Sequence, residues 1–136
     1  ADGVKYLPFT TTDGLLEKYT GAFPFNIPEN ALALIKRGRF GAYIDPVTKK
    51  LHVDFLSTLD TTGGNSGSPS LNSRGELTGL LFDGNYESIV ADYIFDPELT
   101  RSICMDIRFA LWYMDSVDRA DHLIREMNII SPQSSQ

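Results

Sequence analysis

The stretch "DTTGGNSGSPSLNSRGELTGLLFDGN", residues 60–85, places a glycine-rich loop directly before a predicted β-hairpin. Three glycines and two serines lie within six residues, from Gly63 to Ser68. The segments "SLN" and "ELTGLLFD" then flank "SRG", a pattern that predicts two paired strands joined by a tight turn. A loop of this composition can be a flexible linker, a phosphate cradle or the support of a nucleophilic serine.

The residues around the loop exclude the phosphate cradle. A P-loop needs a Lys-Ser or Lys-Thr pair and a helix after its glycines, whereas Ser68 and Pro69 follow here. A dinucleotide-binding loop needs a different glycine spacing and also a helix. The nucleophile elbow of α/β-hydrolases needs glycine two residues after the serine, where this chain has Ser68. A tight β-turn and a catalytic serine loop between strands both remain open.

The rest of the chain predicts helices towards both ends and strands between them. Residues 28–38 ("PENALALIKRG") favour a helix, because Pro28 suits the first turn and Gly38 can end it. "FGAYI" (40–44) and "LHVDFLS" (51–57) predict a hairpin, and "IVADYIFD" (89–96) predicts a further strand. Other helices are predicted for residues 13–18, for the apolar stripe Ile107, Leu111, Met114 and Val117, and for residues 120–127.

Composition narrows the possible partners. The chain has 136 residues, a formal net charge of −6 and no dense basic cluster, which argues against nucleic acid as a partner. One cysteine and two histidines predict no internal disulfide and no metal site, and we expect no cofactor. No apolar stretch reaches the roughly 20 residues that span a bilayer, and the N-terminus lacks a signal-peptide pattern. Cys104 is expected to be a buried thiol.

The loop and its surroundings resemble known proteases. Gly-Asn-Ser-Gly-Ser-Pro, residues 64–69, resembles the Gly-Asp-Ser-Gly-Gly-Pro nucleophile loop of chymotrypsin-like proteases. The longer stretch "TTGGNSGSPSLNSRGELTGLLFDGNYES", with "DPELTRSICMDIRFALWYMD" and "HLIREM" after it, is similar to the C-terminal segment of the bacterial family that contains dipeptidyl peptidases 7 and 11. "PFTTTDGLLEKYTGAFPFNIPE" resembles the family stretch before the serine, so the resemblance covers nearly the whole chain.

This resemblance implies a mainly β fold with flanking helices, as the second barrel of a chymotrypsin-like double β-barrel with C-terminal helices. It divides the chain into a loop and helix segment (1–40), a second-barrel segment with the nucleophile loop (41–103), and C-terminal helices and a tail (104–136). It also implies a first barrel and a helical domain elsewhere in the same protein, a homodimer in the full-length protein, and a location in the periplasm or at the cell surface of a Gram-negative bacterium.

The resemblance further implies the site residues. Ser66 is the expected nucleophile, and the backbone N–H groups of Gly64 and Ser66 are the expected oxyanion donors, roles that suit a tight glycine-rich turn. Asp83 matches the family acid that binds the free N-terminal ammonium of a peptide substrate, which limits the product to dipeptides. Gly84 matches an S1 position where an arginine pairs with acidic P1 side chains, so glycine is expected to leave an open pocket for a hydrophobic P1 residue. From the residues alone, Asp83 and Gly84 would be a turn that closes a hairpin.

The catalytic histidine and aspartate are not expected in this chain. The resembled family takes its histidine from an N-terminal "Asn-His-His-Cys"-like segment, which is missing here. His52 lies on the polar face of a predicted strand and is not the expected base, and His122 is expected to be a surface or packing residue. We therefore expect this chain to be inactive alone. Two remaining structural expectations are a buried ion pair between Arg101 and Asp106, and core or interface contacts for Phe109 and Trp112.

Two other functions stay open at this point. A chymotrypsin-like endopeptidase of the glutamyl-endopeptidase type shares Gly-Asn-Ser-Gly-Ser-Pro, but it has no use for an ammonium-binding carboxylate at Asp83. A non-catalytic peptide-binding module would keep a protease-like barrel while Ser66 is inert. The nucleophile, the oxyanion glycine and Asp83 occur together, which favours the dipeptidyl peptidase.

Overall fold

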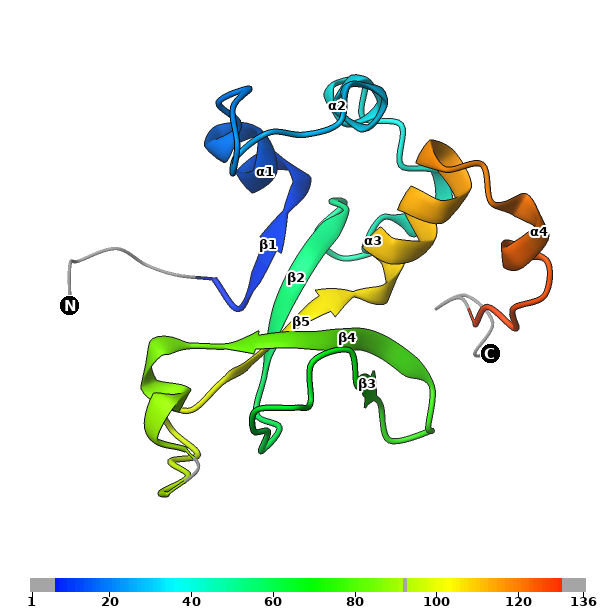
Figure 1. Ribbon diagram of the computed structural model, residues 1–136. Helices are drawn as coiled ribbons and strands as arrows, with labels where there is room; N and C mark the ends of the chain where they lie inside the picture. Colours follow the sequence, from blue (N-terminus) through cyan, green and yellow to red (C-terminus); the bar gives the residue numbers. More distant parts are fainter. Residues whose placement is uncertain (1–6, 92, 131–136) are drawn as a thin grey trace.

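The computed structural model describes residues 7–91 and 93–130, which form a five-stranded antiparallel sheet with several short helices (Figure 1). The strands are β1 (Phe9–Thr11), β2 (His52–Ser57), β3 (Pro69–Leu71), β4 (Leu77–Gly84) and β5 (Ser102–Asp106). The α-helices are α1 (Thr12–Lys18), α2 (Glu29–Lys36), α3 (Ile107–Trp112) and α4 (Asp121–Ile124). Two 3-10 helices, η1 (Gly41–Tyr43) and η2 (Tyr86–Val90), and a π-helical turn, η3 (Tyr113–Val117), complete the described elements.

The sheet has the strand order β1-β2-β5-β4-β3, with all neighbours antiparallel. β5 is the last strand in the chain, yet it lies in the middle and joins β2 to the β3–β4 hairpin (Figure 1). The buried thiol of Cys104 lies on this central strand, as expected. The mainly β fold with flanking helices is therefore confirmed.

The apolar core lies beside α2 and α3, at the helical end of the sheet (Figure 1). Leu51 and Trp112 are fully buried and Ile35 is nearly so. The Trp112 indole N–H donates to the Arg39 carbonyl at 2.9 Å, which satisfies the one polar group of this side chain. Partly buried apolar side chains surround the three residues: Leu15, Leu16, Ile27, Leu34, Phe40, Tyr43, Phe109, Tyr113 and Val117. The expected core role of Trp112 and Phe109 is confirmed.

Most predicted helices form, but the predicted strand at residues 40–44 is wrong. This segment contains η1, and Phe40 and Tyr43 face the core instead of a partner strand. Gly41 has φ +56°, a conformation that interrupts extended backbone. β2 pairs with β1 and β5 instead, so the expected first hairpin does not form.

The strand predicted over residues 89–96 is also wrong. The backbone turns back on itself here, with Tyr93 N–H and Ile94 N–H both donating to the Val90 carbonyl at 3.0 Å. Both edges of β4 are already taken by β3 and β5, so no neighbouring strand position is left beside it. The apolar side chains that suggested a strand are exposed, with Ile89 at 68% and Tyr93 at 91%. Asp92 lies outside the described residues.

Arg108, and not Arg101, pairs with Asp106. The Arg108 guanidinium lies 2.6 Å from the Asp106 carboxylate and 2.7 Å from that of Asp45. Arg101 donates instead to main-chain carbonyls of residues 97, 98 and 100. Partial burial alone would raise the pKa of Asp45, but hydrogen bonds from the Thr48 N–H and the Arg108 guanidinium hold it well below its usual range. The two carboxylates therefore fix the start of α3 against the loop that precedes β2.

Candidate active site

The candidate nucleophile loop joins β2 to β3 and presents Ser66 to solvent. Gly64 has φ +101° and Gly67 has φ +87°, so the chain adopts left-handed conformations on both sides of the serine. A Cβ added at either glycine would meet nothing within 4 Å. Glycine is therefore required here by the backbone conformation and not by lack of space. This conformation displays Ser66 at the tip of a tight turn.

Hydrogen bonds within the loop fix the segment just before the serine. The Thr62 N–H donates to the Asn65 side-chain oxygen at 2.9 Å, and the Asn65 N–H donates back to the Thr62 carbonyl at 3.2 Å. The Asn65 carbonyl accepts from the Ser68 N–H at 2.9 Å. Asn65 thus connects the residues before the turn with those after it.

The sheet holds both ends of the loop. The Gly67 N–H donates to the Leu81 carbonyl at 2.7 Å, which attaches the residue after the serine to β4. At the other end, the Ser102 hydroxyl on β5 donates to the Leu59 carbonyl at 2.9 Å and lies 2.6 Å from the Thr61 hydroxyl. Ser102 is 1% exposed. Sequence reasoning missed this support, because Ser102 is 41 residues away from Thr61 along the chain.

The N–H groups of Gly64 and Ser66, which the resemblance implies as oxyanion donors, are not used in the hydrogen bonds of the loop. Within residues 7–91 and 93–130, the backbone N–H groups of Gly64 and Ser66 donate no hydrogen bond to another group of the chain. In the same turn the N–H groups of Asn65, Gly67 and Ser68 donate hydrogen bonds, whereas within the described residues the Gly63 N–H donates none. Free, fixed N–H groups of this kind can stabilise an oxyanion that develops near the serine hydroxyl.

Asp83 and Gly84 lie at the end of β4, where the strand contains a β-bulge. Leu81 pairs with Cys104, and Asp83 pairs with the next residue of β5, Ile103, so Phe82 is the extra residue. Without the bulge Asp83 would share the sheet face of Leu81. The bulge moves it to the face of Leu80, whose partner Met105 lies two residues from Ile103. The exposed carboxylate accepts from the Gly84 N–H at 2.8 Å.

Gly84 does not open a pocket, contrary to expectation. A Cβ at this position would overlap the hydroxyl of Ser88, so the Ser88 side chain already fills the space beside the glycine. Ser88 is held there by a hydrogen bond from its hydroxyl to the Asn85 carbonyl at 2.6 Å. A larger residue at position 84 would require the Ser88 side chain to move.

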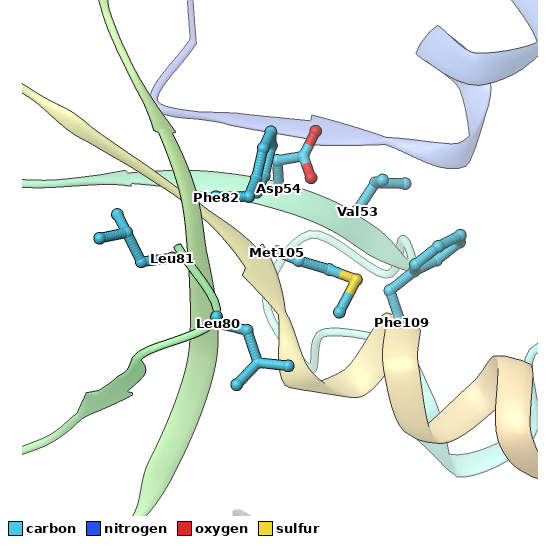
Figure 2. Close-up of a pocket in the computed structure, with 8 residues that line it drawn as sticks. Val53, Asp54, Leu80, Leu81, Phe82, Met105 and Phe109 are labelled. Carbon is cyan, nitrogen blue, oxygen red and sulfur yellow. The ribbon is translucent and has the colours of Figure 1, made fainter. Parts of the chain in front are cut away.

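A shallow apolar cavity of about 380 Å³ adjoins the candidate site (Figure 2). Its lining includes Gly67, next to Ser66 in the chain, and Phe82, next to Asp83. Asp54 is the one ionisable residue of the lining, among Val53, Leu80, Leu81, Met105 and Phe109. Burial raises the pKa of Asp54, while a hydrogen bond from the Thr10 hydroxyl at 3.2 Å acts in the opposite direction. The cavity offers apolar surface close to the loop.

Neither histidine is placed as a general base for Ser66. His52 is buried, its ring stacks on Phe9 with centroids 4.2 Å apart, and its Nε2 lies 2.8 Å from the Thr48 hydroxyl. His122 is exposed on α4. Among the described residues, no three His, Cys, Asp or Glu side chains gather as a metal site would require. No helix in this part of the chain is long and apolar enough to cross a membrane.

Known proteins share both the sequence and this structure. The family model described as Peptidase S46 matches residues 1–129. The chain is 43% identical to an Asp/Glu-specific dipeptidyl-peptidase of Shewanella putrefaciens, over 95% of this chain and 20% of that protein. It is 45% identical to a dipeptidyl-peptidase 7 of Capnocytophaga gingivalis, over 93% of this chain and 18% of that protein. A crystal structure of Porphyromonas endodontalis DPP11 in complex with the dipeptide Arg-Asp matches with a TM-score of 0.89 and 36% identity, over 94% of this chain and 18% of that chain.

These comparisons correct the expected P1 preference. A hydrophobic P1 residue is contradicted by relatives that are named for Asp/Glu specificity and by a matching structure that holds Arg-Asp. The expectation of a hydrophobic P1 residue depended on open space at Gly84, and the Ser88 side chain lies in that space. A missing side chain at one position does not by itself define the pocket.

The chain spans about a fifth of the length of the curated relatives that it matches. Within that fifth, both dipeptidyl-peptidase 7 and Asp/Glu-specific relatives align with nearly the whole sequence, which confirms the resemblance noted from the loop. With the family model matched over residues 1–129, the chain belongs to the peptidase S46 family.

Proposed function

We propose that this chain is the nucleophile-bearing part of a serine-type dipeptidyl peptidase, which releases N-terminal dipeptides from peptides. The observation that carries the proposal is the conformation of the loop. Left-handed glycines on both sides expose Ser66, and the N–H groups of Gly64 and Ser66 have no partner within residues 7–91 and 93–130. Membership of a family whose relatives are named dipeptidyl-peptidases supports this assignment.

In the proposed reaction, the Ser66 hydroxyl oxygen attacks the carbonyl carbon of the second peptide bond of the substrate. The N–H groups of Gly64 and Ser66 stabilise the resulting oxyanion. A histidine base takes the Ser66 proton and gives it to the leaving amine as the C–N bond breaks, while an acid orients that histidine. Water then hydrolyses the dipeptidyl ester on Ser66 and releases the dipeptide. We propose that the histidine and the acid come from an upstream part of a longer protein, because the rings of His52 and His122 lie elsewhere. This chain alone is then inactive.

Asp83 would set the length of the product. Its exposed carboxylate follows the β-bulge at the end of β4. Asp83 is two residues beyond Leu81, whose carbonyl accepts the hydrogen bond from the nucleophile loop. A carboxylate at this place can pair with the free N-terminal ammonium of a peptide that lies beside Ser66. An anchor of this kind would limit the part of the peptide on the N-terminal side of the cut to two residues, as the family resemblance implies.

The resemblance supports three wider proposals about the complete protein. The sheet would be the second barrel of a chymotrypsin-like double β-barrel, completed by a first barrel and a helical domain from the remaining four fifths of the length. The complete protein would be a homodimer, which size-exclusion chromatography with light scattering tests. It would act in the periplasm or at the cell surface of a Gram-negative bacterium, which cell fractionation tests.

The decisive experiment compares dipeptidyl fluorogenic substrates with free and blocked N-termini in the full-length protein. Substrates with acidic and with apolar P1 residues are both included. We expect hydrolysis of free-amine substrates only. Replacing Asp83 with Asn should raise KM for these substrates about 10- to 100-fold, because a hydrogen-bonded ion pair contributes roughly 1.5–3 kcal/mol.

The matched control is Glu87→Gln, which removes one negative charge four residues from Asp83 and keeps an acceptor for the Asn85 amide. It should leave KM unchanged within about twofold, as expected for a substitution outside the binding contacts. Cleavage of blocked substrates would indicate an endopeptidase. A folded full-length protein that cleaves neither form would instead indicate a non-catalytic peptide-binding module.

A further inference from the structure

We propose that Asn65 is a positioning residue for the nucleophile, because it holds the turn that aims the Gly64 and Ser66 N–H groups. The inference rests on the proposed function of Ser66 and adds a residue to it. Asn65 itself would touch no reacting atom. It acts through the conformation of its two neighbours.

The hydrogen bonds of Asn65 close the loop from both sides. Its side-chain oxygen accepts from the Thr62 N–H at 2.9 Å, and its own N–H donates to the Thr62 carbonyl at 3.2 Å. Its carbonyl accepts from the Ser68 N–H at 2.9 Å. Gly64 and Ser66, whose N–H groups donate no hydrogen bond within the described part of the chain, are the two neighbours of Asn65. Each therefore lies next to a residue that hydrogen bonds hold in place.

The loop needs such a support because packing does not provide one. Gly63, Gly64, Ser66 and Gly67 are all exposed, and Cβ atoms at the three glycines would meet nothing within 4 Å. Glycine loses more conformational freedom on folding than any other residue. A left-handed turn flanked by glycines and without packing contacts therefore keeps one conformation only where hydrogen bonds fix it.

The chemistry of the contact predicts which substitutions are tolerated. A backbone N–H is the donor, so the group that faces Thr62 must be the Asn65 carbonyl oxygen. Aspartate carries an acceptor oxygen at the same distance from the backbone and can replace it. Serine carries a shorter and weaker acceptor, and alanine carries none.

The test uses the full-length protein with a free-amine dipeptidyl substrate. Asn65→Ala should lower kcat about 10- to 100-fold, somewhat less than complete loss of an oxyanion donor. KM should stay within about threefold, because the ammonium contact of Asp83 is intact. The rate of inactivation by a small fluorophosphonate should fall in parallel, since this probe reacts with the serine without a peptide. Asn65→Asp should retain kcat within about threefold of wild type.

Asn72→Ala is the matched control. The Asn72 side-chain oxygen accepts from the N–H groups of Arg74 and Glu76 at 2.9 and 3.1 Å, the same chemistry in the turn between β3 and β4. It should leave kcat within about twofold, even if stability falls. If Asn65→Ala does not fold, as judged by circular dichroism, Asn65→Ser replaces it, with an expected loss of about 3- to 10-fold in kcat.

The inference is overturned if a folded Asn65→Ala or Asn65→Ser variant keeps wild-type kcat, or if the aspartate variant is as impaired as alanine. A loss confined to KM would also overturn it. The Ser66→Ala variant shows whether only the role of Asn65 is wrong or the proposed function as well. If Ser66→Ala abolishes hydrolysis while Asn65 variants do not affect it, only the role of Asn65 is wrong; if Ser66→Ala retains hydrolysis, the proposed function itself is wrong.

Discussion

Different interactions stabilise the helical end of the molecule and the candidate nucleophile loop. At the helical end, Trp112 and Leu51 are fully buried, and aromatic rings surround the indole at centroid distances of 5.7–6.2 Å. The loop buries no comparable apolar side chain and depends on hydrogen bonds from Asn65, Ser102 and β4. Burial of apolar side chains should therefore contribute most of the free energy of unfolding, while hydrogen bonds set the geometry of the candidate site.

The largest effect on stability should follow removal of the buried indole. We expect Trp112→Ala to lower the free energy of unfolding by about 3–5 kcal/mol, since it combines lost burial with a cavity. Urea unfolding followed by circular dichroism measures the change. Phe82→Ala is the comparison on the site side; because Phe82 is 48% exposed, its cost should stay below about 1 kcal/mol. Equal costs for the two variants would contradict the distinction between the regions.

A second variant tests whether the ion pairs of Arg108 add to the stability that apolar burial gives the helical end. Arg108→Met leaves Asp106 and Asp45 without their cation, and both carboxylates are largely buried. A loss of about 2–3 kcal/mol is expected, somewhat below that for a fully buried pair. Arg74→Met breaks an exposed pair with Glu76, so its cost should be much smaller than that of Arg108→Met. Similar losses in both variants would show that burial of the pair has no influence.

The same ion pairs predict a response to acid. The pKa of Asp45 is held well below its usual range, so its contribution to stability is fully present above the unfolded-state pKa of about 3.9. This contribution is lost as the pH falls from about 4 towards the lower pKa of the folded state. The difference in unfolding free energy between the wild-type chain and Asp45→Asn should accordingly shrink below pH 4. A difference that stays constant from pH 7 to pH 2 would contradict this assignment.

The smallest effect is expected on the site side of the sheet. Burial raises the pKa of Asp54, so its ionised form is less favourable in the fold than in the unfolded chain, and stability rises as the group is protonated at low pH. Asp54→Asn should therefore raise the melting temperature by about 1–2 °C at pH 7, which corresponds to a fraction of 1 kcal/mol. The gain should disappear near pH 3. A lower melting temperature at pH 7 would mean that the Thr10 hydrogen bond outweighs the burial cost.

Sequence patterns predicted the parts of the fold that depend on local chemistry. The glycine-rich loop, the hairpin around "SRG" and the helix after Pro28 all form as expected. The segments at 40–44 and 89–96 have apolar residues typical of strands, but their conformation depends on the core around Trp112 and on free edges of the sheet. A local sequence pattern indicates neither how a segment packs on the core nor which edges of the sheet are free.

The supports of the candidate site were missed for the same reason. Ser102 reaches the loop across 41 residues of sequence, and the β-bulge that turns Asp83 depends on the register between β4 and β5. Asn65 could have been noticed, since asparagine often accepts hydrogen bonds in turns. The serine motif indicated roles for Ser66 and Gly64 but none for Asn65.

The assignment of Ser66 as the nucleophile can be tested by chemical labelling. The most direct measurement is labelling of the full-length protein with a fluorophosphonate, followed by mass spectrometry of the modified peptide. If Ser66 is the nucleophile, it should be the one labelled residue, and Ser66→Ala should lower kcat about 10⁴-fold or more. Label on a different serine, or undiminished hydrolysis by Ser66→Ala, would contradict it.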